Sequence, residues 1–326
     1  MKVLVTGATG FLGRKLLERI GADHEVRALV RRDVELGVET ALGDVLDPAA
    51  LESAMAGCDV VVHAAGRVSH EDADAGEMWK VHVVGTDNVL NAALAAGVKR
   101  LVHVSSSGTV ACSEDEDFVA NESSPSPLSL ISGWPYYRSK LFSEQSVLAA
   151  EGIEVISLNP SLLLGPGDES GGATSSVRYF LEDKLDAVPS GGLSFVDVRD
   201  VADAVAFVIE GGTPGCRYLL GSANMTFAAF YERLARITDK DPIRWKMPSV
   251  TRSFLGWFPT LGKADGLGLV NKIPRVEVEM GCHTWYIDDA LARRELEWAP
   301  RDPMETLRDT VIDMVNHAAE RGIFPA

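Results

Sequence analysis

Tyr136 and Lys140 are the side chains whose types and spacing point most clearly to chemistry. They stand four residues apart, so a helix would place both on one face. A phenol has a pKa of about 10 and exchanges protons poorly at neutral pH, but a neighbouring lysine cation favours the phenolate. Such a pair can donate or accept the proton of an alcohol while hydride moves at the carbon. The pair therefore predicts chemistry that interconverts alcohols and carbonyls.

Three serines, at positions 105–107, directly follow the apolar run Leu101–Val104. The run predicts a strand, and parallel sheets bind ligands at the carboxyl ends of their strands. A hydroxyl at that point can hydrogen-bond a substrate oxygen and stabilise developing charge. Serine is also common in turns, so ordinary turn chemistry is the alternative.

Glycines 7, 10 and 13 lie in the run TGATGFLG, between a first predicted strand and a first predicted helix. The first glycine permits a tight turn, the second lets the backbone approach a pyrophosphate, and the third lets the helix pack closely on the sheet. The N-terminus of the helix offers free N–H groups to phosphates. This context predicts a dinucleotide site.

Arg31 and Arg32 end the second predicted strand, where a site that prefers NAD has an acidic residue. Guanidinium groups can bind a 2′-phosphate, so the pair favours NADP(H) over NAD(H), although both could simply be solvated. Asp44 follows the third strand and could hold the adenine amino group or serve an ordinary turn. The small residues 64–66 end the fourth strand and leave room for a flat cofactor.

Composition and charge exclude several classes of protein. Apolar residues make up 46% and charged residues 24% of the 326 residues, which is typical of a globular chain. The net charge of −16 argues against general binding to nucleic acids or anionic membranes. The four cysteines stand far apart, which predicts reduced thiols in the cytoplasm and no metal site or disulfide scaffold. No apolar run approaches the length of a membrane span, and a motif that opens at Lys2 leaves no room for a targeting peptide.

Strand and helix signals alternate along the first half of the chain. The predicted strands are 2–6, 25–30, 40–43, 59–63, 100–105 and 154–158, and the predicted helices are 11–20, 48–55, 78–96 and 136–150. The second half is less regular, with helices at 200–210, 225–238, 287–295 and 304–319, a strand at 216–220, a loop over 112–130, and a loop with a short helix over 165–192. Alternation of this kind predicts an α/β fold with a doubly wound parallel sheet.

Four runs resemble a known family when taken together: TGATGFLG (6–13), VHVSSSG (102–108), YYRSK (136–140) and LNPSLLLGPGD (158–168). They are similar to the extended short-chain dehydrogenases/reductases. Within that group they resemble the NAD(P)-dependent epimerase/dehydratase family, in particular its branch of dihydroflavonol-reductase-like and 3-beta-hydroxysteroid-dehydrogenase-like proteins. The resemblance implies a Rossmann-like sheet with a smaller C-terminal α/β domain for the substrate. We expect the dinucleotide domain to span 1–164, with 196–221 returning to it, and the substrate domain to comprise 165–195 and 222–326.

The resemblance also implies roles for single residues. Tyr136 is the general acid/base, while Lys140 lowers the pKa of Tyr136 and holds the ribose. Reductase-like spacing gives the catalytic hydroxyl to Ser106 and epimerase-like spacing gives it to Ser107; we favour Ser106. The segment Asn159–Ser161 would lie near the nicotinamide carboxamide. The predicted cofactor contacts are Gly7, Thr9, Gly10, Phe11, Leu12, Arg31, Arg32, Asp44, Val45, Ala64, Ala65, Gly66, Tyr136, Lys140, Pro160 and Ser161, and the predicted substrate contacts are Ser106, Ser107 and Tyr136.

The chain departs from the family pattern at two places. His82 stands where the family usually has an asparagine that organises a water path to the lysine. It could do the same work or be only a partly exposed helix residue. The Asp-Glu pair that sugar-nucleotide dehydratases carry after the active-site hydroxyl is missing, which argues against dehydration.

Three functions follow as hypotheses. The first is an NADP(H)-dependent oxidoreductase that reduces a carbonyl compound, or the reverse. The second is an NAD-dependent epimerase of a nucleotide sugar, with Arg178, Arg217 and Arg236 either on the substrate diphosphate or, as we favour, in surface salt bridges. The third is a catalytically silent NADP-binding sensor. The apolar stretch 254–259 could line a hydrophobic pocket, form an interface or simply be core. The resemblance further implies a homodimer through helices 74–96 and 136–150.

Overall fold

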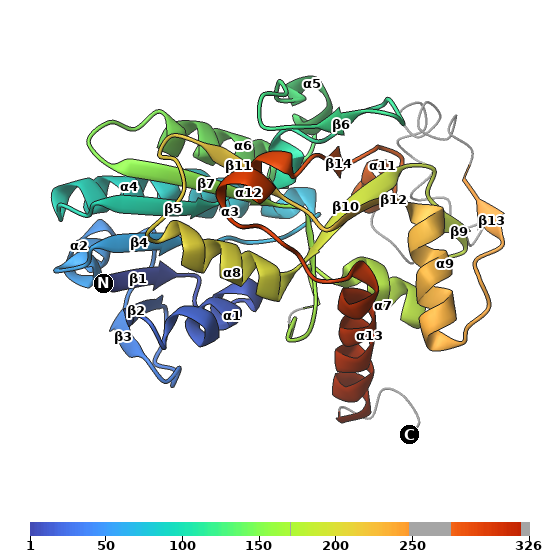
Figure 1. Cartoon of the computed structure of the whole chain (residues 1–326), viewed down its shortest axis with the longest axis horizontal. Helices are drawn as coiled ribbons and strands as arrows, with labels where there is room; N and C mark the ends of the chain where they lie inside the picture. The colour runs from blue at the N-terminus through green and yellow to red at the C-terminus, as the bar shows by residue number, and fades with distance from the viewer. Residues whose placement is uncertain (170, 248–274, 321–326) are drawn as a thin grey trace.

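A seven-stranded, fully parallel sheet forms the centre of the molecule (Figure 1). The computed structural model describes residues 1–169, 171–247 and 275–320. The strand order is β11-β7-β5-β4-β1-β2-β3, so the chain changes direction between β1 and β4. This is the switch point at which such sheets bind ligands, beyond the carboxyl ends of the strands. The strands are β1 (Lys2–Thr6), β2 (Glu25–Val30), β3 (Glu39–Leu42), β4 (Val60–His63), β5 (Arg100–Val104), β7 (Glu154–Pro160) and β11 (Arg217–Leu220).

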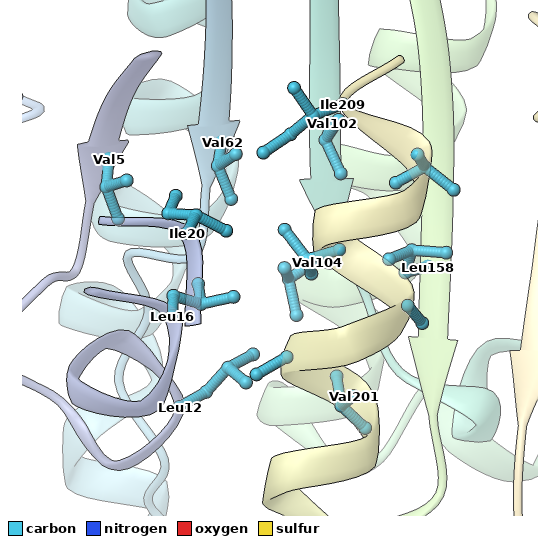
Figure 2. Close-up of a cluster of buried hydrophobic side chains, with 14 of the residues drawn as sticks. Val5, Leu12, Leu16, Ile20, Val62, Val102, Val104, Leu158, Val201 and Ile209 are labelled. Carbon is cyan, nitrogen blue, oxygen red and sulfur yellow. The ribbon is translucent and has the colours of Figure 1, made fainter. Parts of the chain in front are cut away.

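Helices cover both faces of this sheet. Helices α1 (Phe11–Ile20) and α8 (Val198–Val208) pack on one face, and α2 (Pro48–Met55), α4 (Gly85–Ala95) and α6 (Pro135–Leu148) lie on the other. In Figure 2, the side chains of Leu12, Leu16 and Ile20 on α1 point toward α8 and into the apolar cluster between the two helices and the sheet. Their spacing of four residues forms the apolar stripe that buries the helix against β-branched strand residues. The predicted Rossmann-like fold is confirmed.

The predicted helix 78–96 is wrong in its detail. The segment consists of a 3-10 turn, Asp72–Asp74, then α3 (Ala75–Trp79), a π-helical segment, Lys80–Val84, and α4. A π turn inserts one residue into the helical ladder and is common at functional sites. Here it lies at His82, which is buried. Hydrophobic periodicity gives no signal for such an insertion.

A second group of elements follows β7. Strand β10 (Gly192–Asp197) pairs with β8 (Leu162–Leu164) in parallel and with β12 (Ala223–Thr226) antiparallel. Helices α7 (Ser175–Leu181), α9 (Phe227–Thr238) and α13 (Pro303–Glu320) lie around this small sheet and contribute to its apolar core. The remaining elements are η3 (Ser107–Thr109), β6 (Val119–Ala120), α5 (Leu128–Ile131), β9 (Ala187–Val188), β13 (Trp245–Lys246), α11 (Arg275–Gly281), β14 (Tyr286–Ile287) and α12 (Ala290–Glu295).

Several predicted boundaries in this half are wrong. The loop expected at 112–130 contains β6 and the start of α5, and residue 287 belongs to β14, which pairs with β6. The helix expected from 225 begins at Phe227, because Thr226 ends β12 and its hydroxyl caps the helix by accepting the Ala229 N–H. The apolar stretch 254–259 lies outside the described residues. All four cysteines are free thiols. Within the described ranges, the search for a helix with the length and apolar character of a membrane span finds none.

Candidate active site at the sheet switch point

The glycine turn after β1 is shaped by contacts within the protein. Gly7 has a φ of +72°, and a Cβ there would lie 2.6 Å from the backbone of Ala64 and Ala65 at the end of β4. A Cβ on Gly13 would lie 2.1 Å from the Gly7 carbonyl oxygen. Around Gly10 the space is more open, since a Cβ would meet only the Gly7 oxygen, at 3.3 Å. Gly7 and Gly13 are therefore required by the packing of strand, turn and helix, and Gly10 is left exposed toward solvent.

The N-terminus of α1 is open to an anion. Gly10 is the N-cap residue and supplies no side-chain cap, and the first turn carries no acidic residue. The first N–H groups of a helix have no partner within it, so they are available to a phosphate group. Thr9 is exposed beside this end, while Phe11 is partly buried and Leu12 packs into the core.

The predicted ribose and adenine contacts differ in their surroundings. Arg31 and Arg32 are exposed at the end of β2. Asp44 uses one carboxylate oxygen to accept the N–H of Leu46 at 2.9 Å, which is the turn role left open by the sequence. Val45 is buried in the core beneath Gly85 of α4. Of these four predicted contacts, Arg31 and Arg32 are the two with exposed side chains.

A buried chain of hydrogen bonds fixes the end of β4. The Thr6 hydroxyl lies 2.7 Å from Nδ1 of His63 and accepts the N–H of Ala65 at 3.2 Å, and Nε2 of His63 lies 2.9 Å from the Thr86 hydroxyl. Burial and the nearby cation of Lys140 lower the pKa of His63 to about 3, so the ring is neutral. Because the Thr6 hydroxyl also accepts the Ala65 N–H, this series of hydrogen bonds helps to position the small residues 64–66. Sequence reasoning missed His63.

Tyr136 and Ser106 meet at the carboxyl edge of the sheet. Tyr136 lies in the first turn of α6, and Ser106 follows β5. Burial raises the pKa of Tyr136 to about 12, and a hydrogen bond with the Ser106 side chain works against that rise. The neighbouring Ser105 hydroxyl instead donates to the buried carboxylate of Glu144, and Ser107 is itself buried. Ser106 is therefore the serine that the structure places against Tyr136.

Lys140 lies one helical turn behind Tyr136 and is buried. Its Nζ donates to the carbonyl oxygen of Val104 at 2.9 Å. Burial lowers the pKa of Lys140 to about 8, and the charge of Glu144 acts in the opposite direction. A Cβ on Gly66 would lie 3.6 Å from this Nζ, so the ammonium lies close to the exposed Gly66 in the segment that follows β4.

His82 is buried and hydrogen-bonded at both ring nitrogens, so the alternative of a partly exposed helix residue is wrong. Its Nε2 accepts the N–H of Arg67 at 2.9 Å, so a neutral ring carries its proton on Nδ1 and donates it to the Ser139 hydroxyl at 2.8 Å. The Ser139 hydroxyl in turn donates to the carbonyl oxygen of Tyr136 at 2.9 Å. Burial, more than the Lys140 cation, lowers the pKa of His82 to about 2. His82 thereby connects the loop after β4 to the first turn of α6.

Comparisons with known proteins agree with this architecture. Residues 3–221 match the model of the NAD dependent epimerase/dehydratase family. The chain belongs to this family. A putative dihydroflavonol 4-reductase of Synechocystis sp. is 31% identical over 327 residues, covering 96% of this chain and 94% of that protein. Sterol demethylase protein B of Methylococcus capsulatus is 34% identical over 262 residues, covering 76% and 78%. The crystal structure of gox2253 superposes with a TM-score of 0.82 at 29% identity, covering 97% and 98%. The chain is an NAD(P)-dependent oxidoreductase of the epimerase/dehydratase family.

The described residues fit the dinucleotide that this family uses. The open N-terminus of α1 suits a pyrophosphate. At the other end of the site, the buried hydroxyl of Ser161 has no hydrogen-bond partner within the described part of the chain, next to Pro160 at the end of β7. A buried hydroxyl without a partner is costly, and a ligand amide would satisfy it. Asn159 points elsewhere, because its side-chain amide donates to the Ser106 carbonyl oxygen at 3.1 Å.

Two further features of this family member were not predicted. Tyr137 stacks on Trp285 with ring centroids 4.8 Å apart, and a Cβ on Gly108 would lie 2.2 Å from the Tyr137 ring. Glu144 is fully buried on α6, one helical turn after Lys140. The sequence did contain a signal for Glu144. Tyr136, Lys140 and Glu144 are spaced four residues apart, which places all three on one face of α6.

Proposed function

We propose that this chain is an NADP(H)-dependent carbonyl reductase in which Tyr136 is the general acid, or the general base of the reverse reaction. The observation that carries the proposal is the hydrogen bond between the Tyr136 phenol and the Ser106 hydroxyl, with the buried Lys140 ammonium one helical turn further along α6. The similarity over nearly the full length to a protein described as a dihydroflavonol 4-reductase supports carbonyl reduction.

Each side chain has a distinct task in this proposal. The nicotinamide supplies the hydride when it is bound. The hydroxyls of Ser106 and Tyr136 hold the carbonyl oxygen, and Tyr136 delivers its proton to that oxygen. Burial keeps the phenol protonated, because it raises the pKa of Tyr136 to about 12, and a protonated phenol is the form that reduction requires. The Lys140 cation then stabilises the phenolate that remains.

The preference for NADP(H) is part of the proposal and is supported by Arg31 and Arg32. Both are exposed at the end of β2, where guanidinium groups can reach a 2′-phosphate. Calorimetric titration of the cofactor-free protein should show tighter binding of NADPH than of NADH. The substitution Arg31→Asp should remove most of that difference. Equal binding by the wild-type protein would contradict the preference.

The structure weakens one argument for the epimerase alternative. Arg217, which could have met a substrate diphosphate, forms an ion pair with Glu144 at 2.8 Å. A cofactor that copurifies as NAD⁺ and does not exchange would still favour an epimerase. Tight NADPH binding without turnover on any carbonyl compound would favour a silent sensor.

We further propose that two chains associate through α3, the π-helical segment and α6, in the cytoplasm. Trp79 and Phe142 are exposed apolar side chains on α3 and α6, with ring centroids 5.4 Å apart, and Val84 is exposed nearby in sequence. An apolar face of this kind is typical of an interface. Light scattering at micromolar concentration should give the mass of a dimer.

The test of the catalytic role is the substitution Tyr136→Phe. It should leave NADPH affinity nearly unchanged and abolish turnover on a panel of aromatic and aliphatic ketones and aldehydes. A Phe variant with activity near that of the wild type would mean that another group supplies the proton.

A further inference from the structure

Glu144 is a carboxylate without any exposed surface, and the catalytic scheme above does not use it. It lies on α6, one helical turn after Lys140. Burial of a charged carboxylate is strongly unfavourable unless hydrogen bonds and an opposite charge compensate it. The surroundings of Glu144 supply both kinds of partner.

Three polar side chains surround its Oε2. The Ser105 hydroxyl donates a short hydrogen bond, Nδ2 of Asn159 donates at 2.5 Å, and the Thr109 hydroxyl lies at 3.1 Å. The other oxygen, Oε1, lies 2.8 Å from Nη1 of Arg217 on β11. That approach lies off the axis of a hydrogen bond, so the contact between Arg217 and Glu144 is chiefly electrostatic.

These side chains surround Ser106. Ser105 precedes it, and Thr109 follows it by three residues in the same turn. The Thr109 hydroxyl also lies 2.9 Å from the Ser106 carbonyl oxygen, and Nδ2 of Asn159 lies 3.1 Å from that oxygen. Ser106 therefore stands in a short turn whose two flanks are tied to one carboxylate.

The same carboxylate acts on Lys140. The pKa of Lys140 is lowered by burial and raised by the charge of Glu144. The other titratable groups that interact with Lys140 are His63, His82 and His103, and burial lowers the pKa of each so that all three are neutral. Among the described residues that act on the Lys140 ammonium, Glu144 is thus the one with a negative charge.

We propose that Glu144 is a positioning residue that joins the two sides of the active site, by fixing the Ser106 turn through Ser105, Thr109 and Asn159 and by retaining the positive charge of Lys140. Arg217 balances the charge of Glu144 in the interior. The inference rests on the proposed roles of Ser106 and Lys140.

The pair of Glu144 and Arg217 could instead serve stability alone, and variants separate the two roles. Glu144→Gln removes the charge and preserves the shape of the side chain. Arg217→Met leaves the carboxylate in place without its counter-charge, so it should lower stability and leave Lys140 protonated. The double variant Glu144→Gln/Arg217→Met removes both charges and should recover stability. The pKa of Lys140 should nevertheless stay as low as in Glu144→Gln. Glu154→Gln is a matched control, because Glu154 forms an ion pair with Arg100 at 2.6 Å at the opposite end of β7.

The direct readout is the pKa of Lys140, measured from the ¹³Cε chemical shift of labelled lysine in the full chain and assigned with Lys140→Arg. We expect Glu144→Gln to lower this pKa by about one unit or more, since an opposite charge at close range typically contributes that much. The kcat for the best carbonyl compound of the panel should fall about tenfold to hundredfold, with little change in NADPH affinity. Glu154→Gln should change none of these values.

The proposal is overturned if Glu144→Gln leaves the pKa of Lys140 and kcat within error of the wild type, or if Glu154→Gln shifts them equally. If the single variant does not fold, the double variant with Arg217→Met provides the same two measurements. If the wild-type protein reduces no carbonyl compound, the proposed function fails, and the titration of Lys140 alone then decides the role of Glu144.

Discussion

Replacing Lys140 with methionine should relieve a cost that the folded protein carries at neutral pH, while it abolishes turnover. The Lys140 side chain is buried, and burial lowers the pKa of its ammonium from 10.5 to about 8. A lysine with a depressed folded-state pKa binds its proton more weakly in the folded than in the unfolded chain. Its contribution to stability therefore rises with pH between about 8 and 10.5.

The size of the effect follows from the two pKa values. At pH 7 the buried ammonium costs about 3 kcal/mol, and at pH 10 it costs less than about 1 kcal/mol. Methionine avoids this cost but leaves the Val104 carbonyl oxygen without the donor that Lys140 provides at 2.9 Å, a loss of about 1–3 kcal/mol. The loss of this hydrogen bond costs nearly the same at pH 7 and at pH 10, because the neutral amine of wild-type Lys140 also donates to the Val104 carbonyl oxygen. The stability difference between Lys140→Met and the wild type should thus fall by about 2.5 kcal/mol from pH 7 to pH 10.

Urea denaturation of both proteins at pH 7, 8.5 and 10 measures this difference directly. Lys246→Met is the control, because Lys246 is exposed and lies outside the proposed dimer interface, and its difference from the wild type should stay constant across the range. A Lys140→Met difference that also stays constant would refute the reasoning, since it would show that the folded chain does not disfavour the ammonium.

Two other predictions concern the turn after β1 and the exposed helix face. Gly7→Ala should lower the free energy of unfolding by at least about 1–2 kcal/mol, because φ is +72° and the added Cβ would collide with the backbone of residues 64 and 65. Gly10→Ala should cost less stability and chiefly weaken NADPH binding; equal losses of stability in urea denaturation would contradict this contrast. Phe142→Glu should shift the mass in light scattering from dimer to monomer without loss of thermal stability, because Phe142 is 40% exposed. A variant that remains dimeric would place the interface elsewhere.

Local patterns were sufficient to predict the sheet and the positions of the main site residues. The run TGATGFLG, the apolar strands and the pair Tyr136 and Lys140 each depend on neighbours within a few residues. The structure accordingly brings Tyr136, Lys140 and Ser106 together at the predicted edge. The preference for Ser106 over Ser107 came from the spacing seen in reductase-like proteins of the resembled family, and the hydrogen bond between the Ser106 and Tyr136 side chains agrees with it.

The missed features depend on partners that are distant in the sequence. Glu144 meets Arg217, which is 73 residues further along, and the Thr6–His63–Thr86 chain joins two strands and a helix. His82, in the π-helical segment, likewise meets Ser139 and the Arg67 backbone, which lie 57 and 15 residues away. Asp44 and Val45 were both predicted as cofactor contacts; Asp44 makes the turn hydrogen bond that was its alternative role, and Val45 is buried in the core, which the sequence analysis did not foresee.

The two faces of the sheet differ in polarity at the switch point, and the alternation of strand residues explains how. In β4 the run Val-Val-Val-His puts Val60 and Val62 toward α1 and α8, and Val61 toward α2 and α4. His63 therefore continues the face of Val61, and His103 continues that of Leu101 in β5. Both histidines are buried on the side where α6 carries Lys140, with ring centroids 5.6 Å apart. Because burial keeps both rings neutral, they add polarity without adding cations, and a single carboxylate, Glu144, offsets part of the cost of burying the Lys140 ammonium.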